Sequence, residues 1–589
     1  MMTTAGFTRV TRTGRRAAAA AVLAAVCLVA GGCTSLPGDS SPQVVRSFSP
    51  APSTEEEIAP TPGQEPDLLL RDFFTASGKP TQKHQAARAF LTPSVAERWD
   101  DSAATLILDR IDLNAEPGAS EDNISYVVRG TVVGKLETGG VFTPENASYE
   151  AKMELSRTGG QWRISALPPG VIMERTELRN RYTPQELFFF NPSGRMLVRD
   201  RRWVYNGQAS LDTALLSLLM EGPQKLLAPG VVNDIPPTGV FAGYEQGVYG
   251  FTGFEDLDSD ERHRFAAQVV WVLARAGIPG PYRVQLDGTP IDPDHLELSV
   301  EDVAEFNPNA QAGTISPLYA LKNGSLSTID GYTVTPVPGP LGQSQQVESA
   351  DVSSSGGVAA AVISRGSGDS KVSELVLGPV GGPTTKVQEA RTLTRPSFEY
   401  EATAVWSVVD GRTITRIARS TSTGEMSQIE VDSSVLSGQS PDGPGEPISV
   451  LRLSPTGVRV AFIRDGSVWV STVSRPKPGD RAIANATEIA PALGDTALSL
   501  DWLQDGSLVV GTSSPATPVW HVETDGSSLT PLPSGNITAP VVAVAASPST
   551  LYLTDAHAML QLPAAASAAA FWREVPAVQG TRAVPVVAN

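Results

Sequence analysis

The stretch LRLSPTGVRVAFIRDGSVWV, residues 451–470, decides the fold of the C-terminal part of this 589-residue chain. It consists of an apolar strand, a Ser-Pro turn, a buried Val/Ala-containing strand, an Asp-Gly turn and a strand with an aromatic residue. The pattern returns in DVSSSGGVAAAVIS (351–364), LDWLQDGSLVVGT (500–512) and VAASPSTLYLTDAHAMLQL (544–562), and more weakly over 395–417. Turns of successive copies lie roughly 44 to 57 residues apart, which is the length of one β-propeller blade. The repeat predicts an all-β propeller of five or six blades over residues 316–589. The segment YALKNGSLSTID (319–330) is expected to complete a blade by pairing with C-terminal strands, so that no sheet edge stays exposed.

A second unit over residues 185–295 precedes the propeller. LFFFNPSGRMLVRDRRWV (187–204) predicts a hairpin that turns at residues 191–194. A helix is expected to begin after the N-cap Ser210 and to stop at residues 221–223. IPPTGV (235–240), a second helix with Phe265 and Leu273, and the strand YRVQLDGTPI (282–291) follow. This order resembles the GerMN domain of sporulation and spore-germination proteins, and the resemblance implies an α+β interaction module without known catalytic residues.

Residues 64–173 predict a further α+β domain. Apolar positions at helical spacing, divided by Pro80 and Pro93, give way after Leu106 to segments with the period of strands. The segment from Gly160 to Ile164, before Pro168-Pro169, resembles the last strand of the cone-shaped folds similar to nuclear transport factor 2 (NTF2). In such a cone we expect Trp162 to belong to the core. The chain is therefore expected to be multidomain, with two small α+β domains (an NTF2-like cone, then GerMN) before the propeller.

The N-terminal segment predicts export. Four arginines precede an apolar run of about fourteen residues from Ala17, which is too short to span a membrane comfortably. Ala30-Gly31-Gly32-Cys33 resembles a bacterial lipobox, although Ala30 stands where Leu or Val is usual. The resemblance implies signal cleavage between Gly32 and Cys33 and a Cys33 that carries an S-diacylglycerol and an N-palmitoyl chain on the extracytoplasmic face of the cell membrane. The alternative is an ordinary signal peptide and a soluble secreted protein. Residues 1–32 thus form the signal peptide, and the Pro/Ser-rich residues 33–63 form a tether.

Charge and cysteine content exclude several partners and sources of stability. The net charge of −18 becomes about −22 once the four arginines of residues 1–32 are removed. Such a surface repels nucleic acid and anionic lipid, so we expect no nucleic-acid partner and a covalent membrane link. Cys33 is the one cysteine left after cleavage, because Cys27 lies in the apolar run. No intramolecular disulfide can then form, and stability must come from core burial.

Motifs for catalysis or metal binding are weak, and we expect no enzyme, cofactor or metal site. Asp256, Asp258 and Asp260 begin like an EF-hand, but Glu261 stands where glycine is required, so these acids are expected to cap the next helix. The five histidines, His84, His263, His295, His521 and His557, lack metal-ligand spacing. Ser474-Arg475-Pro476-Lys477 fits S-x-x-K, but proline disrupts the helical turn that this chemistry uses.

Two further sets of residues have both a structural and a functional interpretation. The Asp-Gly pairs at Asp410, Asp465, Asp505 and Asp525 are interpreted as tight turns rather than as carboxylates of a glycosidase. Arg195, Arg199, Arg201 and Arg202 form a basic patch that could bind an acidic partner, and a solvated strand face is the favoured interpretation.

The order of lipobox, tether, α+β domain, GerMN-like domain and propeller resembles the LpqB family of actinobacterial lipoproteins over essentially the whole mature chain. The resemblance implies an accessory role in the MtrAB two-component system, through binding to the extracytoplasmic part of the sensor histidine kinase MtrB, with effects on the cell envelope and division. One alternative is a cell-wall glycan-binding protein or hydrolase that uses the propeller funnel. Clustered acids or aromatic residues at the propeller mouth would favour it, and a mouth lined by Ser and Thr would oppose it. A purely structural envelope protein is a third possibility.

Overall fold

The computed structural model describes residues 58–310, 315–353, 357–399, 402–420, 423–437 and 446–588. Residues 56–589 form one compact unit, and the domains below belong to it. The signal segment and the predicted cleavage and lipid-attachment residues, Gly32 and Cys33, lie outside the described residues. Among the described helices, none has the length and apolar character that a membrane crossing requires.

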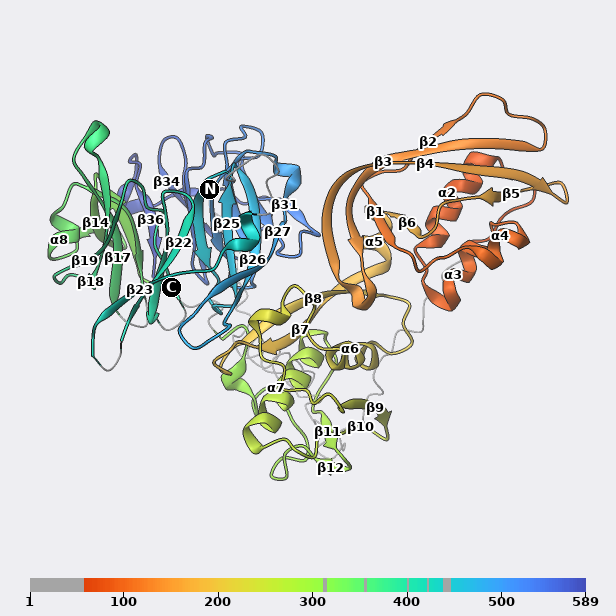
Figure 1. The fold of residues 1–589 in the computed structure, drawn as a ribbon, viewed down its shortest axis with the longest axis horizontal. Coiled ribbons are helices and arrows are strands. Elements are labelled where there is room, and N and C mark those ends of the chain that lie inside the picture. Colours follow the sequence, from red (N-terminus) through yellow and green to blue (C-terminus); the bar gives the residue numbers. More distant parts are fainter. Residues whose placement is uncertain are drawn as a thin grey trace, which may run out of the picture. The chain divides into compact units, whose positions relative to one another are not determined.

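The N-terminal domain packs three helices against a long antiparallel sheet. The helices are α2 (Pro66–Ser77), α3 (Thr81–Arg88) and α4 (Pro93–Arg98). Pro80 and Pro93 separate them, as the sequence predicts, because proline is accepted at a helix start but not inside a helix. Figure 1 shows the helices gathered on one side of the sheet. The core between the two layers includes Leu70, Phe73 and Phe90, and Trp162 packs partly buried against it, as expected.

The sheet has the order β5-β4-β3-β1-β6, with β2 paired to β3. Its strands are β1 (Thr105–Leu108), β2 (Asp112–Ala115), β3 (Asn123–Leu136), β4 (Phe142–Thr158), β5 (Gln161–Ala166) and β6 (Val171–Glu174). The prediction that the segment around Trp162 is the last strand is wrong, because β6 follows it and pairs in parallel with β1. Pro168-Pro169 therefore marks a connection between two strands. The short α5 (Arg175–Arg181) leads into the next domain.

The middle domain begins with the predicted hairpin. Strands β7 (Tyr182–Phe190) and β8 (Leu197–Tyr205) pair from end to end and turn at residues 191–194. Helix α6 (Leu211–Met220) has Ser210 at its N-cap position and ends before Gly222, whose φ of 82° suits glycine. A sheet of order β12-β11-β10-β9 contains β9 (Val240–Glu245), β10 (Val248–Thr252), β11 (Arg283–Leu286) and β12 (Thr289–Pro290).

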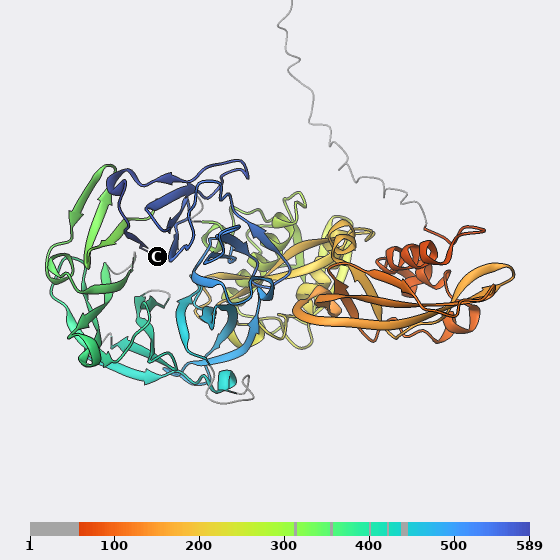
Figure 2. The ribbon, with the colours of Figure 1, turned by 90° about the horizontal axis from the view of Figure 1, so that it is seen from above.

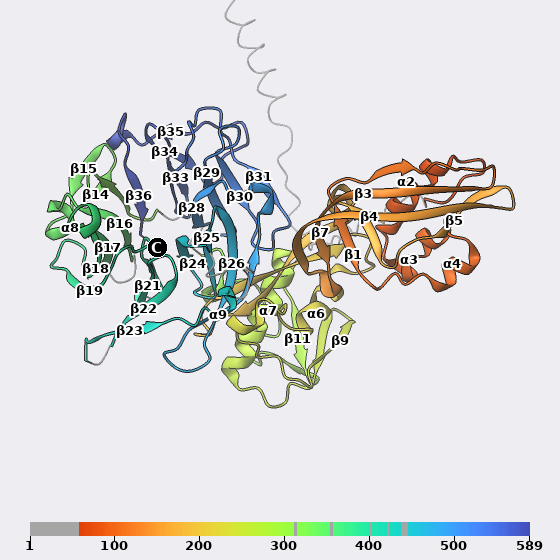
Figure 3. The same ribbon diagram turned by 45° about the horizontal axis from the view of Figure 1, so that its top comes forward.

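Helix α7 (Ser259–Arg275) packs a long buried face into the core of this domain. Its residues Phe265, Val269, Val270 and Leu273 are fully buried. Helices α6 and α7 both lie next to the hairpin strand β7, and Figure 3 shows β9 and β11 beside these helices. Asp258 caps the helix in a capping box with Glu261, so the predicted capping role of these acids is confirmed for Asp258.

The C-terminal region consists of six four-stranded antiparallel sheets in the described residues. From the inner strand outward, the first sheet contains β36 (Val584–Val587), β13 (Leu318–Lys322), β14 (Ser325–Asp330) and β15 (Thr333–Pro336), and the second contains β16 (Val347–Val352), β17 (Val358–Arg365), β18 (Val372–Pro379) and β19 (Thr385–Ala390). The third contains β20 (Ser397–Phe398), β21 (Ala404–Val409), β22 (Thr413–Arg419) and β23 (Met426–Glu430), and the fourth contains β24 (Ile448–Leu453), β25 (Arg459–Arg464), β26 (Ser467–Ser474) and β27 (Ala482–Glu488). The fifth contains β28 (Ala497–Trp502), β29 (Leu508–Thr512), β30 (Val519–Val522) and β31 (Leu529–Pro531), and the sixth contains β32 (Ala543–Ala546), β33 (Thr550–Thr554), β34 (Met559–Pro563) and β35 (Arg573–Glu574). Figure 2 shows the sheets around a central axis, which is the arrangement of a propeller.

The last strand of the chain completes the first sheet. β36 pairs antiparallel with β13, and Leu318 lies opposite Val587 in the register. The predicted pairing of the segment 319–330 with a C-terminal strand is therefore confirmed. It joins the two ends of the propeller region by main-chain hydrogen bonds, which removes an open edge from the ring.

Burial of the strands explains the runs of apolar residues in the repeat. All five residues of β29 are buried. Every interior residue of β25 is buried, and so is every interior residue of β17 except Ser364. These strands pack on both faces against neighbouring sheets, so apolar residues run continuously instead of alternating. Asp410 and Asp465 have φ near 50° and are followed by glycines at 71°, which is the geometry of a tight hairpin turn. The turn interpretation of these two Asp-Gly pairs is confirmed.

Candidate functional site

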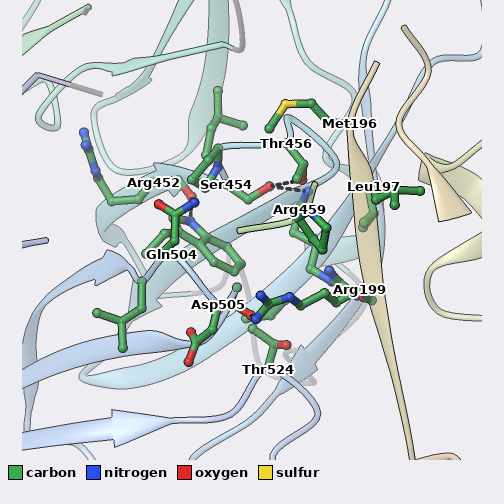
Figure 4. Close-up of a pocket in the computed structure, with 18 of the residues that line it drawn as sticks. Met196, Leu197, Arg199, Arg452, Ser454, Thr456, Arg459, Gln504, Asp505 and Thr524 are labelled. Carbon is green, nitrogen blue, oxygen red and sulfur yellow. Dashed lines mark hydrogen bonds between the residues drawn. The ribbon is translucent and has the colours of Figure 1, made fainter. Parts of the chain in front are cut away.

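A cavity of about 520 Å³ lies between the hairpin of the middle domain and the inner strands of the propeller. One wall comes from β8 and the segment 224–227, and the other from loops and strands of the fourth and fifth sheets. Figure 4 shows Met196 and Arg199 facing Thr456, Arg459 and Asp505 across this space. Its size falls in the range of small-molecule sites, which commonly form where domains meet.

Arg452 forms the floor of the cavity and connects several propeller sheets. Its side chain is 4 % exposed and donates to Asp501 Oδ1 (3.3 Å), to Pro396 O (3.0 Å) and to Asp351 Oδ1 (3.1 Å). Burial opposes the charged guanidinium, but the two carboxylates outweigh it and raise the pKa of Arg452 above its ordinary value. These ion pairs join the inner strands β16, β24 and β28.

The two carboxylates of this network differ in their other partners. Asp351 also has Arg395 at 3.4 Å, whereas no second cation lies within 4 Å of Asp501 in the described residues. Asp501 instead accepts from the backbone N–H of Ala546, on β32, at 3.1 Å. Asp351 likewise accepts from the backbone N–H of Phe398, on β20, at 3.1 Å, so each carboxylate also contacts a neighbouring sheet. The network fixes the sheets against one another, and it leaves neither carboxylate free to act as an acid or base.

Main-chain acceptors and one apolar side chain form part of the contact between the middle domain and the propeller. Thr472 Oγ1 donates to Leu226 O at 2.6 Å, and Asn191 Nδ2 donates to Thr456 O at 3.2 Å. Val458, on a propeller loop, is fully buried in the hydrophobic core of the middle domain. A propeller residue thus completes the core of another domain, which makes the contact an integral part of the fold.

The basic patch predicted on β8 lies in this contact. Arg201 approaches Glu523 Oε2 and Asp525 Oδ2, both at 3.3 Å, and Arg199 donates to Asp505 O. Arg202 is 4 % exposed and pairs with Asp200. The favoured interpretation as a solvated strand face is therefore wrong for three of the four arginines, and only Arg195, at the hairpin turn, is exposed. The acidic partner of the patch is the loop between β30 and β31 of the same chain.

Asp505 and Asp525 also lie in turns, as the sequence predicts, and in addition contribute to the contact between the domains. Both side chains accept from the serine two residues later, Ser507 and Ser527, as local turns do. Asp525 in addition faces Arg201, and Asp505 lies at the cavity wall. These two turns therefore serve both the hairpin and the domain contact.

Ser507, His521 and Asp505 form a cluster that the sequence did not predict. Ser507 Oγ lies 2.8 Å from His521 Nε2 and also donates to Asp505 Oδ1. Burial alone would raise the pKa of Asp505, but the nearby His521 and the hydrogen bonds from Ser507 outweigh it and lower that pKa. The Asp505 carboxylate, 3.8 Å from His521 Nε2, raises the pKa of His521 against the effect of burial.

This cluster lacks the geometry of a catalytic triad. In a triad the carboxylate orients the imidazole through the nitrogen opposite the serine, whereas Asp505 approaches Nε2, the nitrogen that faces Ser507, at 3.8 Å. Ser507 is also 1 % exposed, so a substrate cannot reach its hydroxyl. The cluster is a hydrogen-bonded turn in which the serine is buried and the Asp505 carboxylate is exposed.

The other candidate residues of the sequence analysis are dispersed. His84, His263 and His295 each pair with a single carboxylate: Asp101, Glu305 and Asp292, respectively. No group of three metal-ligating side chains occurs in the described part of the chain. Ser474 ends strand β26, and its hydroxyl donates to Ala482 O at 3.3 Å, so the S-x-x-K match does not lie on a helix.

Comparisons with known proteins agree with the order of the domains. The family models described as "Lipoprotein LpqB, N-terminal domain", "Sporulation and spore germination" and "Lipoprotein LpqB beta-propeller domain" match residues 59–179, 186–292 and 324–588. Lipoprotein LpqB of Corynebacterium diphtheriae is 44 % identical over 563 residues, which cover 94 % of this chain and 96 % of that protein. The chain belongs to the LpqB family. Its LpqB relatives in Rhodococcus opacus and Mycolicibacterium smegmatis are 39 % and 36 % identical, over 97 % and 96 % of this chain and 98 % of each relative.

Proposed function

We propose that this LpqB-family chain is a lipoprotein anchored on the extracytoplasmic face of the cell membrane through Cys33. The order of arginines, apolar run, Gly31-Gly32 and Cys33 supports the anchor, as does the name lipoprotein carried by relatives over nearly their full length. In this proposal cleavage after Gly32 leaves Cys33 with a diacylglycerol and an N-palmitoyl chain. Two or more acyl chains hold a protein stably, whereas one chain binds reversibly.

The proposed role is that of an accessory protein of the MtrAB two-component system, which binds the extracytoplasmic part of the sensor kinase MtrB and modulates its signalling. The observation that carries this role is the near full-length similarity to LpqB proteins, with all three family domains in order. A permanent membrane anchor supports it physically, because it raises the effective concentration of the domains near a membrane-embedded partner.

Two finer features of the fold belong to the proposal. We assign one blade to each of the six four-stranded sheets, which makes a six-bladed propeller with β36 as the closing strand. We also assign the N-terminal domain to the NTF2-like cones. The long strands β3 and β4, with three helices on one side, support this assignment.

The test is crosslinking capture from membranes of cells that produce the wild type, Cys33→Ala or Cys27→Ala. The wild type and Cys27→Ala are expected to be acylated, membrane-bound and enriched for the sensor kinase, because Cys27 lies in the segment that is removed. Cys33→Ala is expected to lose acylation and most of the enrichment. Acylated, membrane-bound Cys33→Ala would refute the anchor. A wild type that never enriches the kinase above background would refute the accessory role and leave the anchor standing.

The glycan-binding or hydrolase alternative gains little from the propeller mouth. A glycosidase needs two carboxylates that can act on a substrate, but Asp351 and Asp501 are both held by Arg452. The mouth carries hydroxyl side chains, among them Ser454, Thr456 and Thr472, beside further carboxylates that each have an arginine or histidine within 4 Å. The acids cluster as a glycan site would require, but their pairing with cations opposes the role of a hydrolase.

A further inference from the structure

We propose that the cavity between the middle domain and the propeller binds a small anion of the carboxylate or phosphate class, with Arg459 as its principal contact. The proposal is independent of the kinase-binding role, because it rests on side chains inside residues 186–525. It assigns a ligand site to a part of the chain that otherwise holds two domains together.

Arg459 is the charge in the cavity that lacks a counter-ion. Its Nη2 donates to Arg199 O at 2.8 Å, and its Nε and Nη1 have no partner among the described residues. No carboxylate of the described chain lies within 4 Å of it, whereas Arg199, Arg201 and Arg452 each have one. Burial lowers the pKa of Arg459, and Asp200 and Asp525 only partly oppose this effect. A partly buried guanidinium without a counter-ion is costly, and an anionic ligand would remove that cost.

Every carboxylate that lines the cavity already has a cationic partner, which determines the sign of the charge that the ligand carries. Each of the eight carboxylates that line it has an arginine or histidine within 4 Å; they are Glu186, Glu305, Asp351, Glu399, Asp501, Asp505, Glu523 and Asp525. A cationic ligand would have to displace one of these partners. An anion meets Arg459 without breaking an ion pair.

Uncommitted polar side chains complete the site. Gln224, Gln504 and Thr524 line the cavity, and their side chains form no hydrogen bond within the described residues. Figure 4 shows Gln504, Thr524 and Arg459 around the same space. Amide and hydroxyl groups can donate to anionic oxygens, while Leu197 and Trp502 supply apolar wall. The ligand is therefore expected to combine an anionic group with a short organic body.

The position of the site links occupancy to the domain contact. Gln224 and Leu197 belong to the middle domain, and Arg459 and Gln504 belong to the propeller. A ligand that touches both walls binds best when the domains are in contact. It should then stabilise the contact by a free energy that grows with the logarithm of the ligand concentration above the dissociation constant.

The test is calorimetric titration of the full-length protein with sodium phosphate and, separately, with sodium succinate at constant ionic strength. Saturable binding of at least one anion is expected. Arg459→Gln should weaken it at least tenfold, Arg459→Lys should restore part of it, and the same change at the exposed Arg110, Arg110→Gln, should leave it unchanged. Binding of phosphate alone, of succinate alone or of both supports the proposal and identifies the anion class.

Gln504→Glu tests the site independently if Arg459→Gln disturbs the contact between the domains, because the Gln504 side chain forms no hydrogen bond with the middle domain in the described residues. Its new negative charge should weaken anion binding at least tenfold, and Gln504→Met should have a smaller effect. Absence of saturable binding of both anions to the wild type would overturn the proposal. Wild-type affinity in Arg459→Gln or in Gln504→Glu would overturn it as well.

Discussion

Replacement of Arg452 by methionine should destabilise the propeller strongly. The loss should come mainly from the carboxylate that is left without a cation. The change removes the one cation within 4 Å of Asp501 in the described residues, while Asp351 keeps Arg395 at 3.4 Å. Asp501 is 2 % exposed, so it would remain as a buried charge without compensation. Breaking a buried ion pair in this manner costs about 3–5 kcal/mol. For a domain of this size the thermal midpoint should fall by about 6–12 °C.

The assay is thermal unfolding followed by tryptophan fluorescence, with double variants that separate the two carboxylates. Adding Asp501→Asn to Arg452→Met should recover most of the loss, whereas adding Asp351→Asn should recover little, because Asp351 retains a partner. Arg365→Met is the matched control: its ion pair with Glu374 is half exposed, and the loss should be about 0–1 kcal/mol. The reasoning is refuted if Arg452→Met costs no more than this control, or if both asparagine variants rescue it equally.

Three further perturbations follow from the described contacts. In Gly230→Ala the new Cβ would lie 2.5 Å from Thr472 Cγ2, so the contact between the middle domain and the propeller should loosen. Hydrogen exchange of the backbone amides of residues 226–230 should then accelerate. Gly250→Ala is the control, because its Cβ meets nothing closer than 3.7 Å and should leave exchange unchanged. Asp505→Asn should lower the pKa of His521 toward its ordinary value, since the Asp505 carboxylate is the main cause of its rise; an unchanged pKa in an NMR titration would contradict this assignment. Because the folded pKa of His521 is raised, the associated stability is present at low pH and lost as pH rises through that pKa, and the variant should lose this dependence. Asp258→Ala removes the capping box of α7 and should cost about 1 kcal/mol in chemical denaturation, whereas Asp256→Ala, outside the box, should cost almost nothing.

Local features of the fold were predictable because short-range chemistry determines them. The turn at residues 191–194, the helix that starts after Ser210 and the Asp-Gly turns at Asp410 and Asp465 all depend on residues adjacent in the chain. The pairing of β13 with β36 is long-range, yet it was predictable from the arithmetic of a repeat that must close. The order of β5 and β6 was not, since Pro168-Pro169 is compatible with a domain end and with a short connection.

The site was largely hidden from sequence reasoning. Arg199 and Arg201 alternate along β8 as solvated residues do, and the acidic loop that meets them lies more than 300 residues later in the chain. Nothing in the local sequence distinguishes the buried Arg452 from an exposed arginine. The sequence signal for this contact was a contrast in charge. A dense group of arginines in a chain of net charge −18 indicates an acidic partner within the same molecule.

The pairing of β36 with β13 has a consequence for how the protein is made. Synthesis proceeds from the N-terminus, so β13 must wait for a strand that lies about 265 residues further along the chain and costs about 5 kcal/mol of loop-closure entropy to bring back. Until then the inner edge of the first sheet has unpaired main-chain groups, which are a template for association with other chains. A chain cut short before Val584 would keep that edge permanently. The first sheet is therefore the place where an incomplete molecule is expected to associate with other chains.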